Sequence, residues 1–200
     1  MKRMIIMAVA ALIATMNINA QAGYDTKHEI GITYGAGCNS DIISSFGGAL
    51  GSALAGSRSE NETHFGTIAL EYFYHATEVI GVGAIAGFAQ NKEDIYFRNS
   101  DSKMGKNNDT YITIMPSVKF NWLRKDHFGM YSKLAAGVMF SKFKYESDKN
   151  SSNDDSQNET KFNWQASLIG AEVGGANVRA FAELGFGEQG IILGGVRFKF

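Results

Sequence analysis

Apolar side chains alternate with polar or small ones, residue by residue, in eight separate stretches of this chain. Near the C-terminus, for example, Val178, Ala180 and Leu184 fall on one face and Arg179, Glu183 and Gly185 on the other. A period of two is typical of β-strands with one apolar face, whereas a helix would need a period of 3.6. The predicted strands are residues 27–36, 64–75, 79–89, 111–122, 128–141, a stretch that begins at 162, 178–187 and 192–200. We therefore expect an all-β fold.

The composition excludes several classes of protein. Lys and Arg number 19 and Asp and Glu number 20, so the chain has no basic footprint for nucleic acid. Apolar residues make up 44% of the chain, and it has 23 glycines but one proline, which fits neither disordered nor collagen-like proteins. The single cysteine, Cys38, forms no internal disulfide and supports no Cys-based zinc site.

The N-terminus has the features of a signal peptide. Lys2 and Arg3 precede an apolar run over residues 4–14, and Ala20-Gln21-Ala22 supplies a small-x-small cleavage site. The run is too short to cross a bilayer, which requires about 20 residues. We expect residues 1–22 to be a cleaved signal peptide and residues 23–200 to be the mature domain. An uncleaved anchor and a buried first helix are the alternatives.

Aromatic residues on the apolar face lie near the ends of the predicted strands, and aliphatic residues lie between them. Two aromatic bands around an aliphatic belt are typical of a membrane-spanning barrel, because amphipathic rings prefer the membrane interface. One predicted band contains Tyr72, Tyr74, Phe120, Trp122, Phe128, Phe198 and Phe200. The other contains Tyr34, Phe88, Phe140, Phe162, Trp164 and Phe186.

The opposite face combines many glycines with charges of both signs. Small residues leave space inside a narrow eight-stranded barrel, and long charged side chains fill it. Opposite charges enclosed there must pair, since an unpaired buried charge is very costly. The alternative, a soluble sandwich or lipocalin-like barrel with this face in water, predicts more Lys and Glu and fewer glycines. The predicted lumenal charge cluster is Glu29, Glu71, Lys119, Lys133, Arg179, Glu183 and Arg197.

The connections between the strands alternate in length. Long polar connections at residues 37–63, 90–110 and 142–160 are predicted extracellular loops, because outer-membrane barrels carry long loops outside and short turns in the periplasm. The short connection at residues 188–190 departs from this pattern. We therefore predict an eight-stranded antiparallel up-and-down transmembrane β-barrel with a signal peptide and porin-like architecture.

Two residues do not fit a regular barrel strand. Pro116 lies in the middle of a predicted strand, where it removes one ladder hydrogen bond, so a local bulge or kink is expected. Glu172 falls on the lipid-facing side if its strand runs unbroken from Phe162. Either a bulge near Leu168 and Ile169 shifts the register, or Glu172 lies at the periplasmic rim.

Together these features resemble small outer-membrane β-barrel proteins of Gram-negative bacteria, of the type of outer membrane protein X and the barrel domain of outer membrane protein A. The resemblance covers essentially the whole mature chain and rests on the leader, the eight alternating stretches and the terminal residues 194–200. Residues 115–120 and 181–185 also resemble recurring pieces of such barrels. The terminal alternation with Phe198 and Phe200 resembles the sorting signal that the outer-membrane assembly machinery reads. The resemblance implies no cofactor and no fixed activity.

Candidate chemistry is sparse, and no catalytic residue, cofactor or metal site is predicted. The four histidines, at positions 28, 64, 75 and 127, lie at predicted strand ends, where rim positions are more common than metal ligands. Ser132 faces outward but has no histidine at its height, so a lipid deacylase is disfavoured. The acidic stretch 146–160 has hard oxygen ligands, yet its spacing fits no EF-hand. Residues 40–54 are either a short helix that plugs the lumen or rests on the membrane, or a flexible loop.

The leading functional hypothesis is a monomeric outer-membrane barrel with a structural or surface-recognition role carried by its extracellular loops. Its expected partners are outer-membrane lipids and lipopolysaccharide, the assembly machinery through the C-terminal strand, and an unknown extracellular ligand. A small pore or ligand conduit is the first alternative, and a lipid A-modifying enzyme is the second. A secreted binder of small apolar molecules would replace all three if the apolar face proved to be enclosed.

Overall fold

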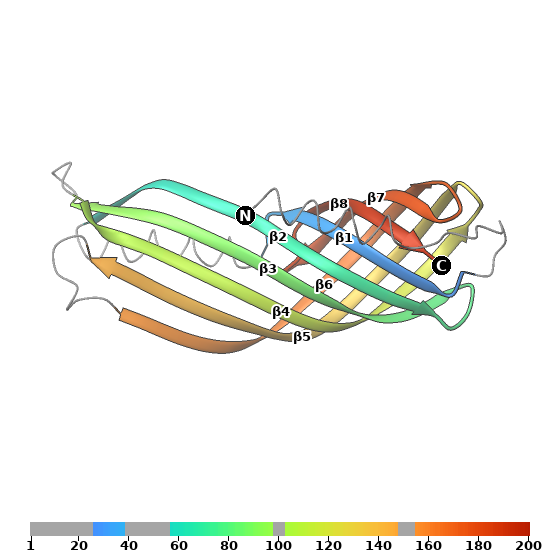
Figure 1. Ribbon diagram of the computed structural model, residues 1–200, viewed down its shortest axis with the longest axis horizontal. Coiled ribbons are helices and arrows are strands. Elements are labelled where there is room, and N and C mark those ends of the chain that lie inside the picture. Colours follow the sequence, from blue (N-terminus) through green and yellow to red (C-terminus); the bar gives the residue numbers. More distant parts are fainter. Residues whose placement is uncertain (1–25, 39–56, 98–102, 148–154) are drawn as a thin grey trace.

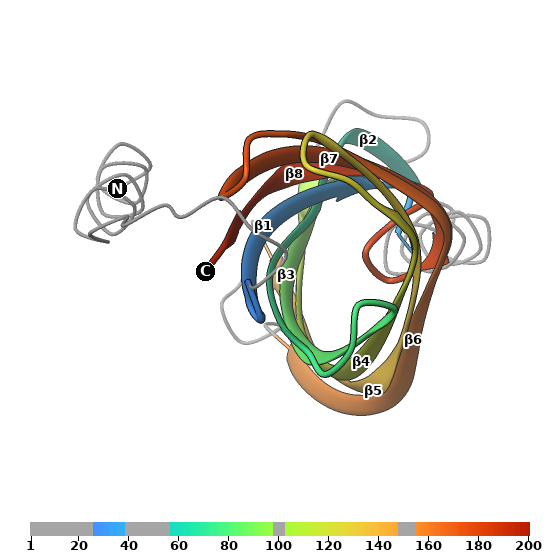
Figure 2. The same ribbon diagram turned by 90° about the vertical axis from the view of Figure 1, so that its right-hand side faces the viewer.

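Eight antiparallel strands close into a barrel in the computed structural model (Figures 1 and 2). Each strand pairs with the next one along the chain, and β1 pairs with β8. The strands are β1 (His28–Ala36), β2 (Ser57–His75), β3 (Ile80–Phe97), β4 (Lys103–Arg124), β5 (Phe128–Ser147), β6 (Asp155–Gly174), β7 (Val178–Gly187) and β8 (Ile192–Lys199). The predicted eight-stranded up-and-down barrel is confirmed.

The structure describes four ranges of the chain, residues 26–38, 57–97, 103–147 and 155–200. The predicted signal peptide and the segment 40–54 lie outside these ranges. Within them, no helix is long and apolar enough to cross a membrane.

The ring closes where the first and last strands meet. Ile32 lies opposite Val196 in this pairing, and the ladder runs from Glu29 to Ala36. Two further backbone hydrogen bonds extend it to the end of the chain, because the amides of His28 and Phe200 each donate to the other's carbonyl at 2.9 Å. No strand edge is left open along this part of the ring, because β1 pairs with β2 on one side and with β8 on the other.

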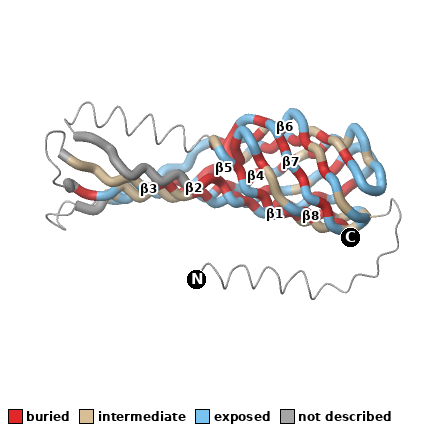
Figure 3. The backbone as a smooth tube through the Cα atoms, turned by 90° about the horizontal axis from the view of Figure 1, so that it is seen from above, coloured by how far each residue is buried: buried red, intermediate tan, exposed pale blue. Residues whose placement is uncertain are grey.

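Side chains alternate between the two faces of the wall, as Figure 3 shows by the alternation of buried and exposed residues. In β7 every second residue is buried, starting with Arg179, and the residues between them are exposed. The exposed positions form an apolar belt around the outside, with Leu70, Leu134 and Leu184 each more than half exposed. Large apolar side chains therefore face outward while charged ones are enclosed, which is the reverse of a water-soluble barrel.

Five neighbouring strands continue well beyond the barrel. Strands β2 to β6 have 18 to 22 residues, whereas β1, β7 and β8 have 8 to 10. We call the five-stranded sheet that extends beyond the closed ring the extension; it occupies the left half of Figure 1. Much of the three predicted long loops is therefore strand, namely residues 57–63, 90–97, 103–110, 142–147 and 155–160. The predicted loop boundaries were wrong there because backbone ladder bonds do not require apolar side chains.

A bulge in β6 changes which residues of its second half face the lumen. The register with β7 shifts between Ser167 and Ile169, and the register with β5 shifts at the same height. Leu168 and Ile169 consequently both face outward, and Glu172 is buried with 3% of its surface exposed. The hydroxyl of Ser132 donates to the Leu168 carbonyl at 2.6 Å and fastens the bulge. Of the two alternatives for Glu172, the structure has the bulge.

Pro116 is accommodated without a bulge. It lies opposite Ala84 in an unbroken register with β3, and no register shift occurs beside it on the β5 side. The ladder with β5 instead skips Met115 and Pro116 and resumes at Ser117 in the same register. The expected bulge is therefore absent, because a gap in one ladder is enough to accommodate the missing N–H.

Replacing Pro116 with alanine tests whether the gap in the β4–β5 ladder results from the missing N–H of proline. The Pro116→Ala variant supplies an N–H at the gap, and we expect the free energy of unfolding to rise by about 1 kcal/mol. Denaturant unfolding in detergent micelles measures this change. Val118→Ala, on the same outward face, changes side-chain volume without changing the ladder and is the control. A lower unfolding midpoint for Pro116→Ala than for the parent protein would contradict the interpretation.

Candidate functional site

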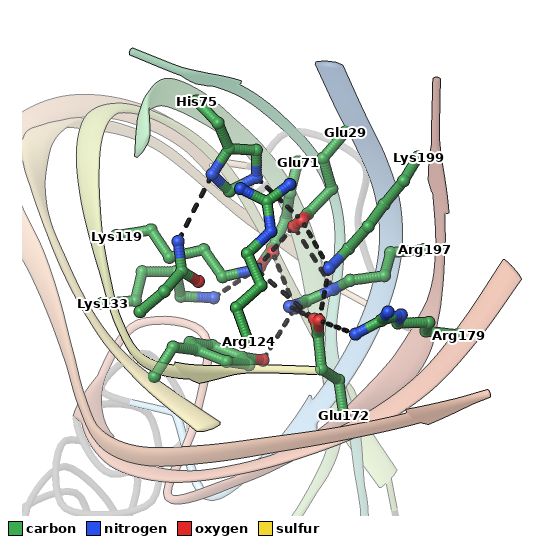
Figure 4. A network of polar contacts seen from close by, with 12 residues as sticks. Glu29, Glu71, His75, Lys119, Arg124, Lys133, Glu172, Arg179, Arg197 and Lys199 are labelled. Atoms are coloured by element: carbon green, nitrogen blue, oxygen red, sulfur yellow. Dashed lines mark hydrogen bonds and ion pairs between the residues drawn. The ribbon is translucent and has the colours of Figure 1, made fainter. Parts of the chain in front are cut away.

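Charged side chains fill the closed part of the barrel (Figure 4). Each of them is at most 5% exposed, and they come from β1, β2 and β4 to β8. We call this set the lumenal network: Glu29, Glu71, Glu172 and Glu183 with Lys119, Lys133, Arg179, Arg197 and Lys199. Four carboxylates thus face five cations inside a space from which the barrel wall excludes the surrounding medium.

Arg197 lies at the centre of the network. Its Nη1 donates to Glu172 Oε2 at 2.9 Å, and its Nη2 lies 3.4 Å from Glu183 Oε1. Its Nε lies 3.4 Å from Glu29 Oε1 and its Nη2 lies 3.9 Å from Glu71 Oε2, so one guanidinium is within ion-pair distance of all four carboxylates. The ring of Phe181 packs against the guanidinium, with its centroid 3.7 Å from Cζ. A planar group with five donors suits this position better than a lysine would.

Two of the network's three lysines, Lys119 and Lys133, each lie between two carboxylates. Lys133 Nζ lies 2.6 Å from Glu71 Oε1 and 2.9 Å from Glu183 Oε2. Lys119 Nζ donates to Glu29 Oε1 at 2.7 Å and lies 4.1 Å from the ring centroid of Tyr131. Each lysine therefore has compensation for the loss of water on more than one side.

The end of the network away from the extension is tied to the short turns. Arg179 donates to Glu172 Oε1 at 2.8 Å and to the carbonyls of Lys125 and Asp126 at 2.9 and 2.8 Å. Lys199 also contacts Glu172. His75 Nε2 lies 3.2 Å from Glu29 Oε2. These contacts join the turn after β4 to the ion pairs of the lumen.

The structure places all seven residues of the predicted lumenal charge cluster in this network. The predicted cluster did not include Glu172, because its inward position depends on the bulge at Leu168 and Ile169, which the sequence left as one of two alternatives. The predicted cluster also left out Lys199, although the alternation of β8 puts that residue on the inner face.

The lumen contains an apolar layer that glycines and charges alone do not predict. Ile85 and Met115 are fully buried and cluster with Ala69 and Ala135. Phe73 is also fully buried, and Lys119 Nζ lies 5.7 Å from its ring centroid. The interior is therefore packed by rings and aliphatic chains as well as by ion pairs.

The predicted aromatic girdle residues lie on the outside of the wall. Phe198 is half-buried and stacks on Phe200, with 5.7 Å between ring centroids. The ring of His28 also stacks on Phe200. Their roles as membrane girdles, and that of Phe198 and Phe200 as an assembly signal, stay predictions. The exposed members are Tyr34, Tyr72, Tyr74, Phe88, Phe120, Trp122, Phe128, Phe140, Phe162, Trp164, Phe186 and Phe200.

No catalytic arrangement forms among the described residues. Ser132 is bonded to a backbone carbonyl in the bulge. His28 contacts the hydroxyl of Tyr72 at 2.9 Å, and His127 contacts the Gly174 carbonyl at 3.1 Å. No group of three or more His, Cys, Asp or Glu side chains in these ranges suits a metal ion. The side chain of His64 lies outside the described part of the chain.

Comparisons with known proteins give likenesses among solved structures. No family model matches the chain, and no curated protein matches it. The chain is similar to the crystal structure of Ail, the attachment invasion locus protein of Yersinia pestis, at 18% identity and a TM-score of 0.42, over 88% of this chain and 97% of that one. A second structure of Ail, in complex with the heparin analogue sucrose octasulfate, is 17% identical with a TM-score of 0.43 and the same coverage. Here the fold follows from the strand pairing itself.

Removing the central arginine tests the role of the lumenal network in stability. The Arg197→Met variant leaves four carboxylates without their shared partner, and we expect a loss of about 3–5 kcal/mol in the free energy of unfolding. Denaturant unfolding in micelles, followed by tryptophan fluorescence, measures it. The control is Lys161→Met, which removes an exposed ion pair with Glu159 (2.5 Å) and should cost at most about 1 kcal/mol. Equal effects of the two variants would argue against a central role for Arg197.

Proposed function

We propose that this protein spans the outer membrane of a Gram-negative bacterium and carries the extension outside the cell as a recognition surface. The observation that supports membrane insertion is the inverted wall, with an apolar belt outside and paired charges within. In β4 the belt covers residues 112–122, which matches the 9–11 residues that a tilted strand needs to cross the hydrocarbon layer. Lipids and lipopolysaccharide would surround this belt.

The proposed orientation follows from the difference between the two ends. The turns at residues 76–79, 125–127 and 175–177 are short, and the other end carries the extension. In outer-membrane barrels the short turns are periplasmic. The predicted signal peptide supports export, and the closing strand β8, with Phe198 and Phe200, is the segment that we propose the assembly machinery reads.

Recognition is proposed for the open edges of the extension. Residues 155–163 of β6 pair with β5, and the pairing of β6 with β7 starts only at Gln165. On the other side, the pairing of β2 with β1 stops at Thr67. In the described part of the chain these two edges therefore have no strand beside them. An unpaired strand edge binds an extended peptide through backbone hydrogen bonds.

The lumenal network weighs against the alternative of a small pore. Eight strands enclose a space just wide enough for side chains, and paired charges and rings occupy that space. A structural or recognition role therefore fits this barrel better than conduction.

Cell fractionation and gel mobility test the location. We expect the protein in the outer-membrane fraction, with a faster band before boiling than after it, because closed barrels resist dodecyl sulfate at room temperature. Protease added to intact cells is expected to cut within the extension and spare the barrel. Recovery of the protein from the soluble periplasmic fraction would contradict the proposed location.

A peptide library tests the proposed recognition edge. Phage-displayed random peptides, selected on the purified protein in micelles, should be enriched in sequences that favour extended chains. The double variant Asn158→Lys and Thr160→Lys crowds the β6 edge with like charges and should weaken binding of the selected peptides at least tenfold.

The matched control places the same two charges inside the extension, as Asn108→Lys and Thr110→Lys in β4, which is paired on both sides. This variant should bind like the parent protein. Equal loss of binding in both variants would show that charge, and not the edge, governs recognition.

A further inference from the structure

The turn between β7 and β8 is buried, although it lies at the end of the barrel that faces the extension. Glu188 and Gln189 are each 1% exposed, and Gly190 is buried with them. A short turn at a barrel rim ordinarily points away from the wall and meets solvent. This one instead folds back into the lumen.

Side chains from two other strands hold the turn in this position. The hydroxyl of Thr67 in β2 donates to the Glu188 carbonyl at 2.7 Å. The amide of Gln165 in β6 bonds the turn twice, because its Oε1 accepts from the Gln189 N–H at 2.8 Å and its Nε2 donates to the Gly190 carbonyl at 3.1 Å. The Glu188 carbonyl, the Gln189 N–H and the Gly190 carbonyl therefore have side-chain partners in the lumen.

The turn also caps the lumenal network. Gln189 Nε2 donates to Glu71 Oε1 at 2.7 Å, and the same oxygen lies 2.6 Å from Lys133 Nζ. The Gln189 amide thus occupies a position where a water molecule would otherwise solvate the Glu71 carboxylate. Buried carboxylates need such donors when they are removed from water.

Three glycines make this inward fold sterically possible. Gly187 and Gly190 flank the buried pair with φ values of 130° and 126°, a region that side chains disfavour. Gly35 in β1 lies against the turn, and a Cβ atom there would stand 1.7 Å from the Gln189 carbonyl oxygen. Because position 35 has no side chain, β1 leaves room for the turn to enter the lumen.

We propose that residues 188–190 form a plug that closes the extracellular mouth of the lumen and keeps water and solutes from the lumenal network. The word extracellular rests on the function proposed above, whereas the closure itself does not. The plug contacts the ion pairs below it through the hydrogen bond from Gln189 to Glu71, whereas its bonds to Thr67 and Gln165 involve no charged group. Displacing it would uncover Glu71 and its neighbours while leaving the central contacts of Arg197 in place.

A thiol placed beneath the plug reports whether it is closed. Ser167 is 1% exposed and lies two residues further along β6 than Gln165, where its hydroxyl donates to Glu183 Oε2 at 2.5 Å. The Ser167→Cys substitution is nearly isosteric. In a Cys38→Ser background it gives a protein with one cysteine, since Cys38 is the only one in the chain. The probe is a charged, water-soluble methanethiosulfonate, and mass spectrometry follows the modification in micelles.

Two alanine variants of β1 distinguish the plug from general loosening of the barrel. Gly35→Ala adds a methyl group where the turn stands and should expel it. Gly31→Ala lies on the same inner face, but its added Cβ would be 3.5 Å from the nearest atom, an ordinary contact. We expect the thiol at position 167 to react at least tenfold faster in the Gly35→Ala protein and at the parent rate in the Gly31→Ala protein.

A second pair of variants covers the case in which Gly35→Ala does not fold, as judged by heat-modifiable gel mobility. Thr67→Val combined with Gln189→Ala removes two anchors without adding bulk, and it should also speed the reaction. Thr33→Val is its control, because the buried Thr33 hydroxyl has no hydrogen-bond partner. Fast modification of the parent protein, or a rate that no folded plug variant changes, would overturn the proposal. Since micelles suffice, this outcome is independent of whether the protein resides in the outer membrane.

Discussion

The pairing of enclosed charges is the constraint on which the rest of this structure depends. Nine charged side chains form the lumenal network, and Arg197 alone contacts its four carboxylates, Glu29, Glu71, Glu172 and Glu183. Because an unpaired charge there would be very costly, strands far apart in sequence must meet in one register. A shift of one residue in β8 would turn Arg197 outward and leave those carboxylates without their common partner.

The closed ring and most of the network could be predicted because both depend on a period of two. Once β7 is recognised as a strand, Arg179 and Glu183 must share a face, and the same rule places Lys119 and Lys133 inside. The rule fails where the period changes. The bulge at Leu168 and Ile169 turns Glu172 inward, and only its partners Arg179, Arg197 and Lys199 show why that direction is favoured.

Other features could not be read from the sequence because side-chain pattern does not specify them. The extension continues through polar residues such as Asn107 and Asn108, where the ladder of backbone bonds, and not burial, maintains the strand. The inward turn likewise depends on Gln165, whose side chain looks like any polar residue of the inner face. The two hydrogen bonds that Gln165 makes to the turn can be recognised only once the structure places β6 beside the β7–β8 turn.

The closed barrel and the extension meet at the height of the turn between β7 and β8. Strands β1, β7 and β8 end there, so the ring that encloses the charges opens into a sheet with free edges. Without a cover, the last ion pairs of the lumen would meet solvent at that opening, and the apolar wall would no longer isolate them. At this boundary Gln189 supplies a neutral donor to Glu71, and the buried Glu188 adds bulk. A short turn is sufficient because the barrel is narrow, and a wider ring would need a longer insertion to achieve the same closure.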